Sequence, residues 1–89
     1  MEKEKVKSLV NRLKRIEGQL RGVQKMIQEE RSCQETLTQL AAARHALDEV
    51  GIRLITKSME ECLKESPDNC EEAVEKALKI FTRLYSYLK

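Results

Sequence analysis

The chain has 89 residues, of which 36% are charged and 3% aromatic, with three glycines and one proline. This composition favours helices with solvated outer faces over a β-sheet or a disordered chain, and it leaves a lone chain few large side chains to fill a core. We therefore expect a single all-α domain over residues 1–89 that associates with further copies of itself.

The net charge of +2 is unevenly distributed along the chain. Residues 1–31 carry nine Lys/Arg and five Glu, a net +4, whereas residues 32–89 carry eight Lys/Arg and ten Asp/Glu, a net −2. The N-terminal segment is therefore the expected contact for a polyanion. Because the chain lacks both the roughly 20-residue apolar run of a membrane span and the apolar segment of a signal peptide, we expect a cytoplasmic protein without a membrane partner.

The first predicted helix covers residues 6–27 and has an apolar stripe. Its members recur at alternating spacings of three and four: Val6, Leu9, Leu13, Ile16, Leu20, Val23 and Ile27. This heptad pattern predicts a face that packs against another helix. Gly18 and Gly22 weaken the helix, and their expected use is to let a neighbouring backbone come close. The opposite surface is basic, with no acidic residue between Lys5 and Arg15, which indicates either a solvated face or a phosphate-contacting surface.

The second predicted helix covers residues 32–64 and has a cysteine near each end. Ser32 and Glu35 form a capping-box pattern, and helical spacing then relates Leu37, Leu40, Ala41, Leu47, Val50, Leu54, Ile55, Met59 and Cys62. Cys33 and Cys62 are 29 residues apart, which is about 44 Å along a helix, so they cannot meet within one protomer. Yet 29 steps of about 100° bring both thiols to nearly the same face. An antiparallel helix from a second copy would pair Cys33 of one chain with Cys62 of the other.

The cysteines suit thiol chemistry or soft-metal binding. They form no CxxC motif, so the sequence gives no support to a zinc-ribbon or a thioredoxin-like protein. Cys33 follows the Ser32 cap, where the helix dipole favours negative charge, so it is expected to be the more reactive thiol. Cys62, near a helix C-terminus, suits a resolving partner, and the alternative is that both cysteines are small core residues. Ser58 precedes Cys62 by one turn, where a third metal ligand would sit, but a hydroxyl is a poor ligand for Cu(I).

A third predicted helix follows the break at Ser66-Pro67, with Asp68 or Asn69 as its cap. Its apolar residues are again three and four apart: Val74, Ala77, Phe81, Leu84 and Leu88. Cys70 stands near its start and is either incidental or an auxiliary resolving thiol. The single histidine, His45, lies off the apolar stripe and is expected to be exposed rather than a metal ligand.

The run from Arg12 to Gly22, then Cys33, residues 37–42 and Cys62, resembles the CsoR/RcnR family of bacterial repressors. The resemblance covers essentially the whole chain. It implies a three-helix protomer, an antiparallel four-helix bundle in the dimer, and a dimer of dimers. This homotetramer would bind double-stranded operator DNA without a helix-turn-helix and release it on sensing an inducer. The residues then expected to contact DNA are Arg12, Lys14, Arg15 and Arg21.

Within this family, Cu(I) sensors are expected to use a Cys, a His and a Cys where this chain has Cys33, Ser58 and Cys62. Nickel and cobalt sensing need several histidines. The Cys/non-His/Cys pattern is similar to the CstR branch of persulfide-responsive repressors, and implies that reactive sulfur species modify Cys33, which then bridges to Cys62 of the partner chain without a metal or other cofactor.

Three other functions remain as alternatives. One is a Cu(I)-responsive repressor that uses Cys33 and Cys62, with Cys70 or an exogenous thiol as third ligand. Another is a helical scaffold that does not bind nucleic acid. An enzyme is least favoured, since the sequence shows no constellation of residues for turnover.

Overall fold

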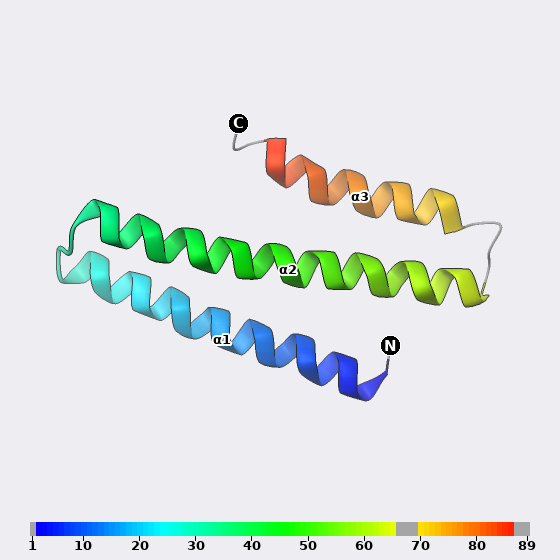
Figure 1. Ribbon diagram of the computed structural model, residues 1–89, viewed down its shortest axis with the longest axis horizontal. Coiled ribbons are helices and arrows are strands. Elements are labelled where there is room, and N and C mark those ends of the chain that lie inside the picture. The colour runs from blue at the N-terminus through cyan, green and yellow to red at the C-terminus, as the bar shows by residue number, and fades with distance from the viewer. Residues whose placement is uncertain (1, 66–69, 87–89) are drawn as a thin grey trace. The chain divides into compact units, whose positions relative to one another are not determined.

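The computed structural model describes residues 2–65 and 70–86 and consists of three helices (Figure 1). They are α1 (Lys3–Gln28), α2 (Cys33–Glu65) and α3 (Cys70–Ser86), and the described residues contain no strand. The all-α prediction is therefore confirmed. By its contacts the chain divides into two compact units, one formed by Glu2–Val50 and the other by the chain from Gly51 on, so that α2 contributes to both.

The unit Glu2–Val50 is an antiparallel hairpin of α1 and the first half of α2 (Figure 1). Its buried apolar residues are Ile16 and Val23 on α1 and Ala43 and Val50 on α2. The members of each pair are seven residues apart, which is two helical turns, so each helix turns one face toward the other. Burying a valine or isoleucine side chain stabilises a fold by about 1.5–3 kcal/mol, and these contacts hold the hairpin together.

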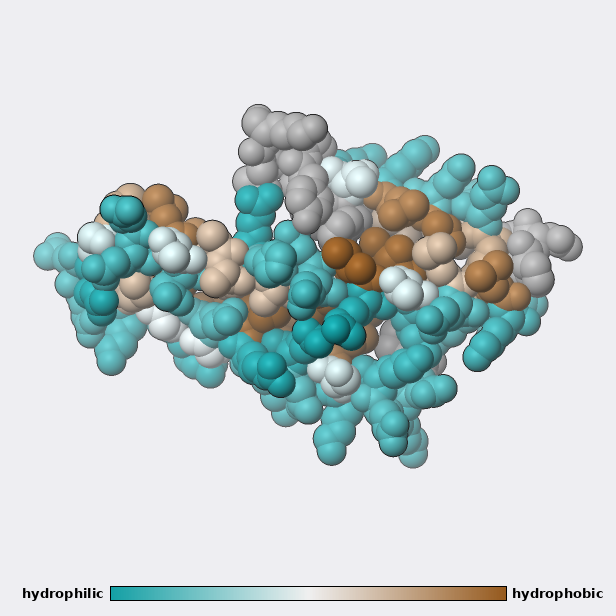
Figure 2. Space-filling view, in the orientation of Figure 1, coloured by the Kyte–Doolittle hydropathy of each residue, from teal (hydrophilic) through white to brown (hydrophobic). Residues whose placement is uncertain are grey.

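The rest of the predicted apolar stripe on α1 is only partly covered within this chain. Val6, Leu13, Leu20 and Ile27 remain 38% to 63% exposed. On the first half of α2 the same is true of Leu37, Leu40 and Leu47. Figure 2 shows apolar side chains interrupting the polar surface. The stripe thus packs against another helix at only some of its positions, and its exposed members fit the expectation of self-association.

A Schellman turn ends α1 and reverses the chain. The N–H of Arg31 donates to the carbonyl oxygen of Met26 at 2.9 Å, and the N–H of Glu30 donates to that of Ile27 at 3.1 Å. Within this turn Glu30 takes the left-handed conformation, with φ 54°. Glycine is the usual residue there, because a side chain at positive φ costs about 1–2 kcal/mol. This turn sets where α2 begins.

The second unit contains the rest of α2 together with α3. Cys70 is its buried residue, at 4% exposure, and Ile55, Val74 and Ala77 are half-buried, the last two in agreement with the apolar spacing predicted for this helix. The predicted helix stop at Ser66-Pro67, the predicted cap at Asp68 or Asn69, and Leu88 lie outside the described residues. Among the helices that the structure describes, none is long and apolar enough to cross a membrane.

Candidate functional site

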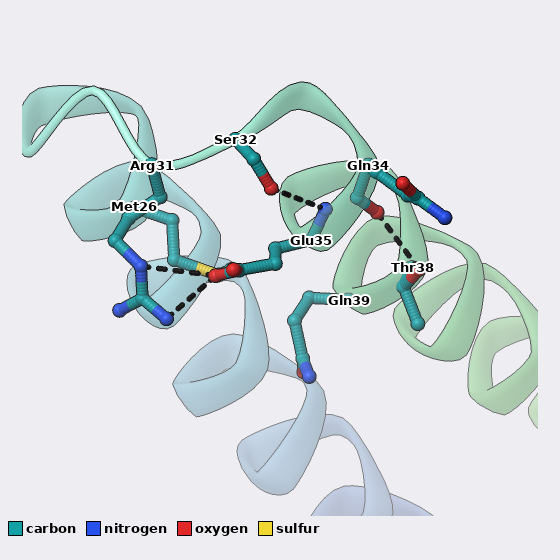
Figure 3. A pocket seen from close by; sticks show the side chains of 7 residues that line it. All are labelled: Met26, Arg31, Ser32, Gln34, Glu35, Thr38 and Gln39. Atoms are coloured by element: carbon teal, nitrogen blue, oxygen red, sulfur yellow. Dashed lines mark hydrogen bonds and ion pairs between the residues drawn. The ribbon is translucent and has the colours of Figure 1, made fainter.

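Cys33 is the first residue of α2, and it is exposed and free. The hydroxyl of Ser32 accepts a hydrogen bond from the N–H of Glu35 at 3.1 Å, which confirms one half of the predicted capping box. The other half is wrong, because the Glu35 carboxylate binds Arg31 instead, with Oε2 2.7 Å from Nη2 and 3.0 Å from Nε (Figure 3). A guanidinium is a stronger partner for a carboxylate than a main-chain N–H. The Arg31 side chain thus forms an ion pair with Glu35 on the surface beside the start of α2.

An open pocket lies at this corner of the hairpin (Figure 3). Its lining comes from the end of α1, the turn and the first turns of α2: Met26, Arg31, Ser32, Gln34, Glu35, Thr38 and Gln39. Thr38 Oγ1 donates to the carbonyl oxygen of Gln34 at 2.8 Å, which fixes one wall. Cys33 does not line this pocket, but it stands in the chain between two of the lining residues and is exposed.

Cys62 and Cys70 form a disulfide within the second unit. Their Cα atoms are 5.3 Å apart, inside the roughly 4.4–6.8 Å range typical of disulfides. Cys62 is half-buried, whereas Cys70 is 4% exposed with its Sγ 4.0 Å from the carbonyl oxygen of Met59. Of the two interpretations of Cys70, this pairing favours the auxiliary resolving thiol, and its role stays a prediction. Sequence reasoning missed this pair because the residues between the two cysteines offered no prediction of their path.

The predicted sensing pair concerns two chains rather than one. Cys33 belongs to the unit Glu2–Val50 and Cys62 to the unit from Gly51 on. The pairing of these thiols across a dimer therefore stays a prediction. Ser58, one turn before Cys62, is exposed, and so is His45, as expected.

The candidate DNA-binding residues all lie on α1 but differ in their surroundings. Arg12 Nη1 lies 3.3 Å from Glu49 Oε2, an ion pair between α1 and α2 that leaves the Arg12 side chain 32% exposed. Lys14, Arg15 and Arg21 are exposed. Lys14 and Arg21 are seven residues apart and share a face. Arg12 and Arg15 instead contribute to a shallow pocket lined by Glu4, Lys7, Ser8, Asn11, Arg12 and Arg15.

The two glycines of α1 do not admit a neighbouring backbone of the same chain, as far as the described residues extend. A Cβ added to Gly22 would meet nothing within 4 Å, and one added to Gly18 would meet only Arg21 Nη2, at 3.8 Å. The predicted close approach is thus wrong within one protomer. Both residues lie away from the buried face formed by Ile16 and Val23, so α2 does not reach them.

Within the part of the chain that the structure describes, no three His, Cys, Asp or Glu side chains gather as a metal site. Cu(I) prefers thiolate, thioether or imidazole ligands, whereas Ser58 offers a hydroxyl and the sulfur of Cys62 is bonded to Cys70.

Comparison with known proteins shows that the chain is a transcriptional repressor. Residues 5–83 match the family described as metal-sensitive transcriptional repressor, and the chain belongs to this family. The resemblance to CsoR/RcnR repressors is thereby confirmed. Repressors of this family bind operator DNA and act as oligomers, and the family is one of regulators rather than enzymes.

Individual relatives agree with this assignment. The chain is 35% identical over 77 residues to the copper-sensing transcriptional repressor CsoR of Bacillus subtilis (strain 168), covering 84% of this chain and 76% of that protein. It is 40% identical over 52 residues to the copper-sensing transcriptional repressor RicR of Mycobacterium tuberculosis (strain ATCC 25618 / H37Rv), covering 58% of this chain and 54% of RicR.

Two solved structures share the fold. The nickel-responsive transcriptional regulator InrS superposes with a TM-score of 0.79 at 41% identity, covering 84% of this chain and 90% of that one. The copper-sensing repressor CsoR with Cu(I) from Geobacillus thermodenitrificans NG80-2 gives a TM-score of 0.76 at 31% identity, covering 96% and 91%.

Proposed function

We propose that this repressor senses reactive sulfur species, namely persulfides and polysulfides, through Cys33 and Cys62, and leaves operator DNA when these cysteines are modified. The observation that carries the proposal is the set of donor groups. Cys33 is free and exposed, and the position one turn before Cys62 holds the hydroxyl of Ser58 rather than a soft metal ligand. Two thiols without a third soft ligand suit the formation and exchange of sulfur–sulfur bonds better than they suit a metal.

The sensing reaction has two steps. In the first, the Cys33 thiolate attacks the terminal sulfur of a persulfide RSSH, the S–S bond of the reagent breaks, and RSH leaves with Cys33 converted to its persulfide. In the second, the thiolate of Cys62 from the partner chain attacks the inner sulfur of that persulfide, forms a Cys33–Cys62 disulfide and releases hydrosulfide. Two thiols are oxidised, and the transferred sulfur is reduced to sulfide.

The bridge would act on DNA through the geometry of the oligomer. A covalent link between chains favours one arrangement of the dimer, and operator binding favours another, so modification shifts a two-state equilibrium. The exposed cations Lys14, Arg15 and Arg21 are the proposed phosphate contacts, while Arg12 contributes less because it is paired with Glu49. Binding to operator DNA would place the protein in the cytoplasm, and the resemblance to CsoR/RcnR repressors implies that it acts there as a homotetramer.

A second candidate function is Cu(I) sensing through Cys33 and Cys62. It is favoured by the copper-sensing relatives from Bacillus subtilis and Mycobacterium tuberculosis. The donor chemistry speaks against it, because Ser58 stands where a third soft ligand is needed. Nickel sensing, the activity named for InrS, fits a chain with a single histidine less well still.

The test replaces the first thiol. With DNA from upstream of its own gene, the Cys33→Ala variant should bind as tightly as the wild type but should not be released by an organic persulfide. The Cys70→Ser variant is the matched control, since it removes a thiol but keeps the sensing pair, and it should still be released. Persulfide-driven release of Cys33→Ala would refute the proposal. Copper sensing would be established if Cu(I) released the wild type from DNA in the presence of a competing strong chelator and persulfide did not release it.

A further inference from the structure

We infer that Cys70 is a second partner for Cys62, and that the disulfide between them withdraws Cys62 from the bridge with Cys33. The site is a thiol pair inside one protomer, distinct from the pair between protomers. The inference rests on the proposed function only for the role of Cys62 in sensing. Its substrate class is the same, a low-molecular-weight persulfide.

In the second unit Cys62 and Cys70 lie close enough to bond to each other. Cys62 and Cys70 are eight residues apart in sequence with Cα atoms 5.3 Å apart, so closing the bond orders only a short loop.

Burial assigns a different role to each sulfur. Cys70 is 4% exposed, and its Sγ lies 4.0 Å from the main-chain carbonyl oxygen of Met59. Cys62 is half-buried. A reagent in solution therefore meets Cys62, and Cys70 acts as the resolving thiol.

The chemistry balances without another oxidant. The Cys62 thiolate attacks the terminal sulfur of RSSH, breaks its S–S bond and releases RSH, which leaves a persulfide on Cys62. The Cys70 thiolate then attacks the inner sulfur of that persulfide, forms the Cys62–Cys70 disulfide and expels hydrosulfide. The two thiols lose two electrons, which reduce the transferred sulfur to sulfide.

The consequence is competition for one sulfur atom. While Cys62 is bonded to Cys70, a persulfide on Cys33 of the partner chain has no Cys62 thiolate to resolve it. The interprotomer bridge then forms only after a reductant reopens the intraprotomer disulfide. The repressor's response therefore depends on two inputs, the reactive sulfur that modifies Cys33 and the reducing capacity that keeps Cys62 free.

Trypsin separates the three cysteines, so each bridge has its own signature. Cleavage after Lys and Arg places Cys33 in peptide 32–44, Cys62 in peptide 58–64 and Cys70 in peptide 65–76. The full-length Cys33→Ala variant is reduced, treated with glutathione persulfide, quenched with an alkylating reagent and sorted by size on a non-reducing gel before digestion. This variant leaves both members of the proposed pair unchanged, and Cys33→Ala with Cys70→Ser is its matched control.

We expect monomeric Cys33→Ala to yield peptide 58–64 linked to peptide 65–76, and the control to lose that link. Full alkylation of both cysteines in the Cys33→Ala monomer would overturn the inference. So would a link between these peptides found only in the dimer band.

DNA release separates this inference from the proposed function. Wild type carrying the Cys62–Cys70 disulfide should not be released by persulfide. The same protein should be released when a reductant has opened the disulfide and has been removed before persulfide is added, whereas Cys70→Ser should be released without this pretreatment. Release of Cys33→Ala refutes the sensing proposal and leaves the peptide result standing. Equal release of wild type with and without the disulfide refutes the competition between the two bridges.

Discussion

The left-handed residue in the turn before Cys33 makes a stability prediction. Glu30 has φ 54° and carries its side chain in a conformation that costs about 1–2 kcal/mol. In Glu30→Gly this cost is removed, but glycine gains more freedom in the unfolded chain, so we expect a net stabilisation of about 0.5–1 kcal/mol. For a domain of this size that corresponds to a rise in Tm of about 2–8 °C. The hydrogen bonds of Arg31 to Met26 and of Glu30 to Ile27 involve only the main chain and are retained.

The assay is thermal unfolding followed by circular dichroism, with every variant at the same protomer concentration because an oligomer's Tm depends on it. Glu29→Gly is the matched control. Glu29 has φ −84° and ψ 2°, where glutamate carries no such cost, so glycine there should lower stability by about 0.5–1 kcal/mol. Its ion pair with Lys25, at 4.0 Å on the surface, contributes little. Equal losses of Tm in the two variants would show that Glu30 is not held in the left-handed conformation in solution.

Two further predictions concern α1. Arg15→Ala should weaken operator binding and reduce the slope of log affinity against log salt by about 0.9 for each phosphate that the side chain no longer neutralises, measured between about 50 and 200 mM salt. Arg12→Ala should have a smaller effect because Glu49 already pairs with this guanidinium, and an unchanged slope for Arg15→Ala would remove Arg15 from the interface. Gly22→Ala should raise stability by about 1 kcal/mol in thermal unfolding, because the new methyl group meets nothing within 4 Å and alanine favours the helix. A fall in Tm would indicate that a partner subunit packs against Gly22.

Helix periodicity predicted the fold well because it depends on local sequence. The 3,4 spacing on α1 identified a helix, and Ile16 and Val23 are the members of that stripe that the protomer buries. The same spacing did not distinguish Val23 from Leu20, which remains 38% exposed. A heptad pattern reports that a face is apolar, but it does not report how much of the face is covered by the same chain.

The pairings between elements were not accessible in the same way. Arg12 and Glu49 are separated by 37 residues, and the capping pattern of Ser32 and Glu35 gave no sign that Arg31 would take the carboxylate. Which partner a charged side chain binds depends on which groups lie nearest to it in three dimensions and on which of them are charged. Prediction from spacing alone therefore identified the candidate residues more reliably than their partners.

The cysteines show why this difference matters for function. Helical spacing related Cys62 to Cys33 through a common face, an argument that considers only residues on one helix. Cys70 lies beyond the end of α2, so periodicity could not relate it to Cys62, yet it is the residue whose sulfur is bonded to Cys62. Both pairings use the same atom, and a thiol can resolve only one persulfide at a time. The number of sulfur partners available to Cys62, rather than the reactivity of Cys33 alone, would then determine when this repressor responds.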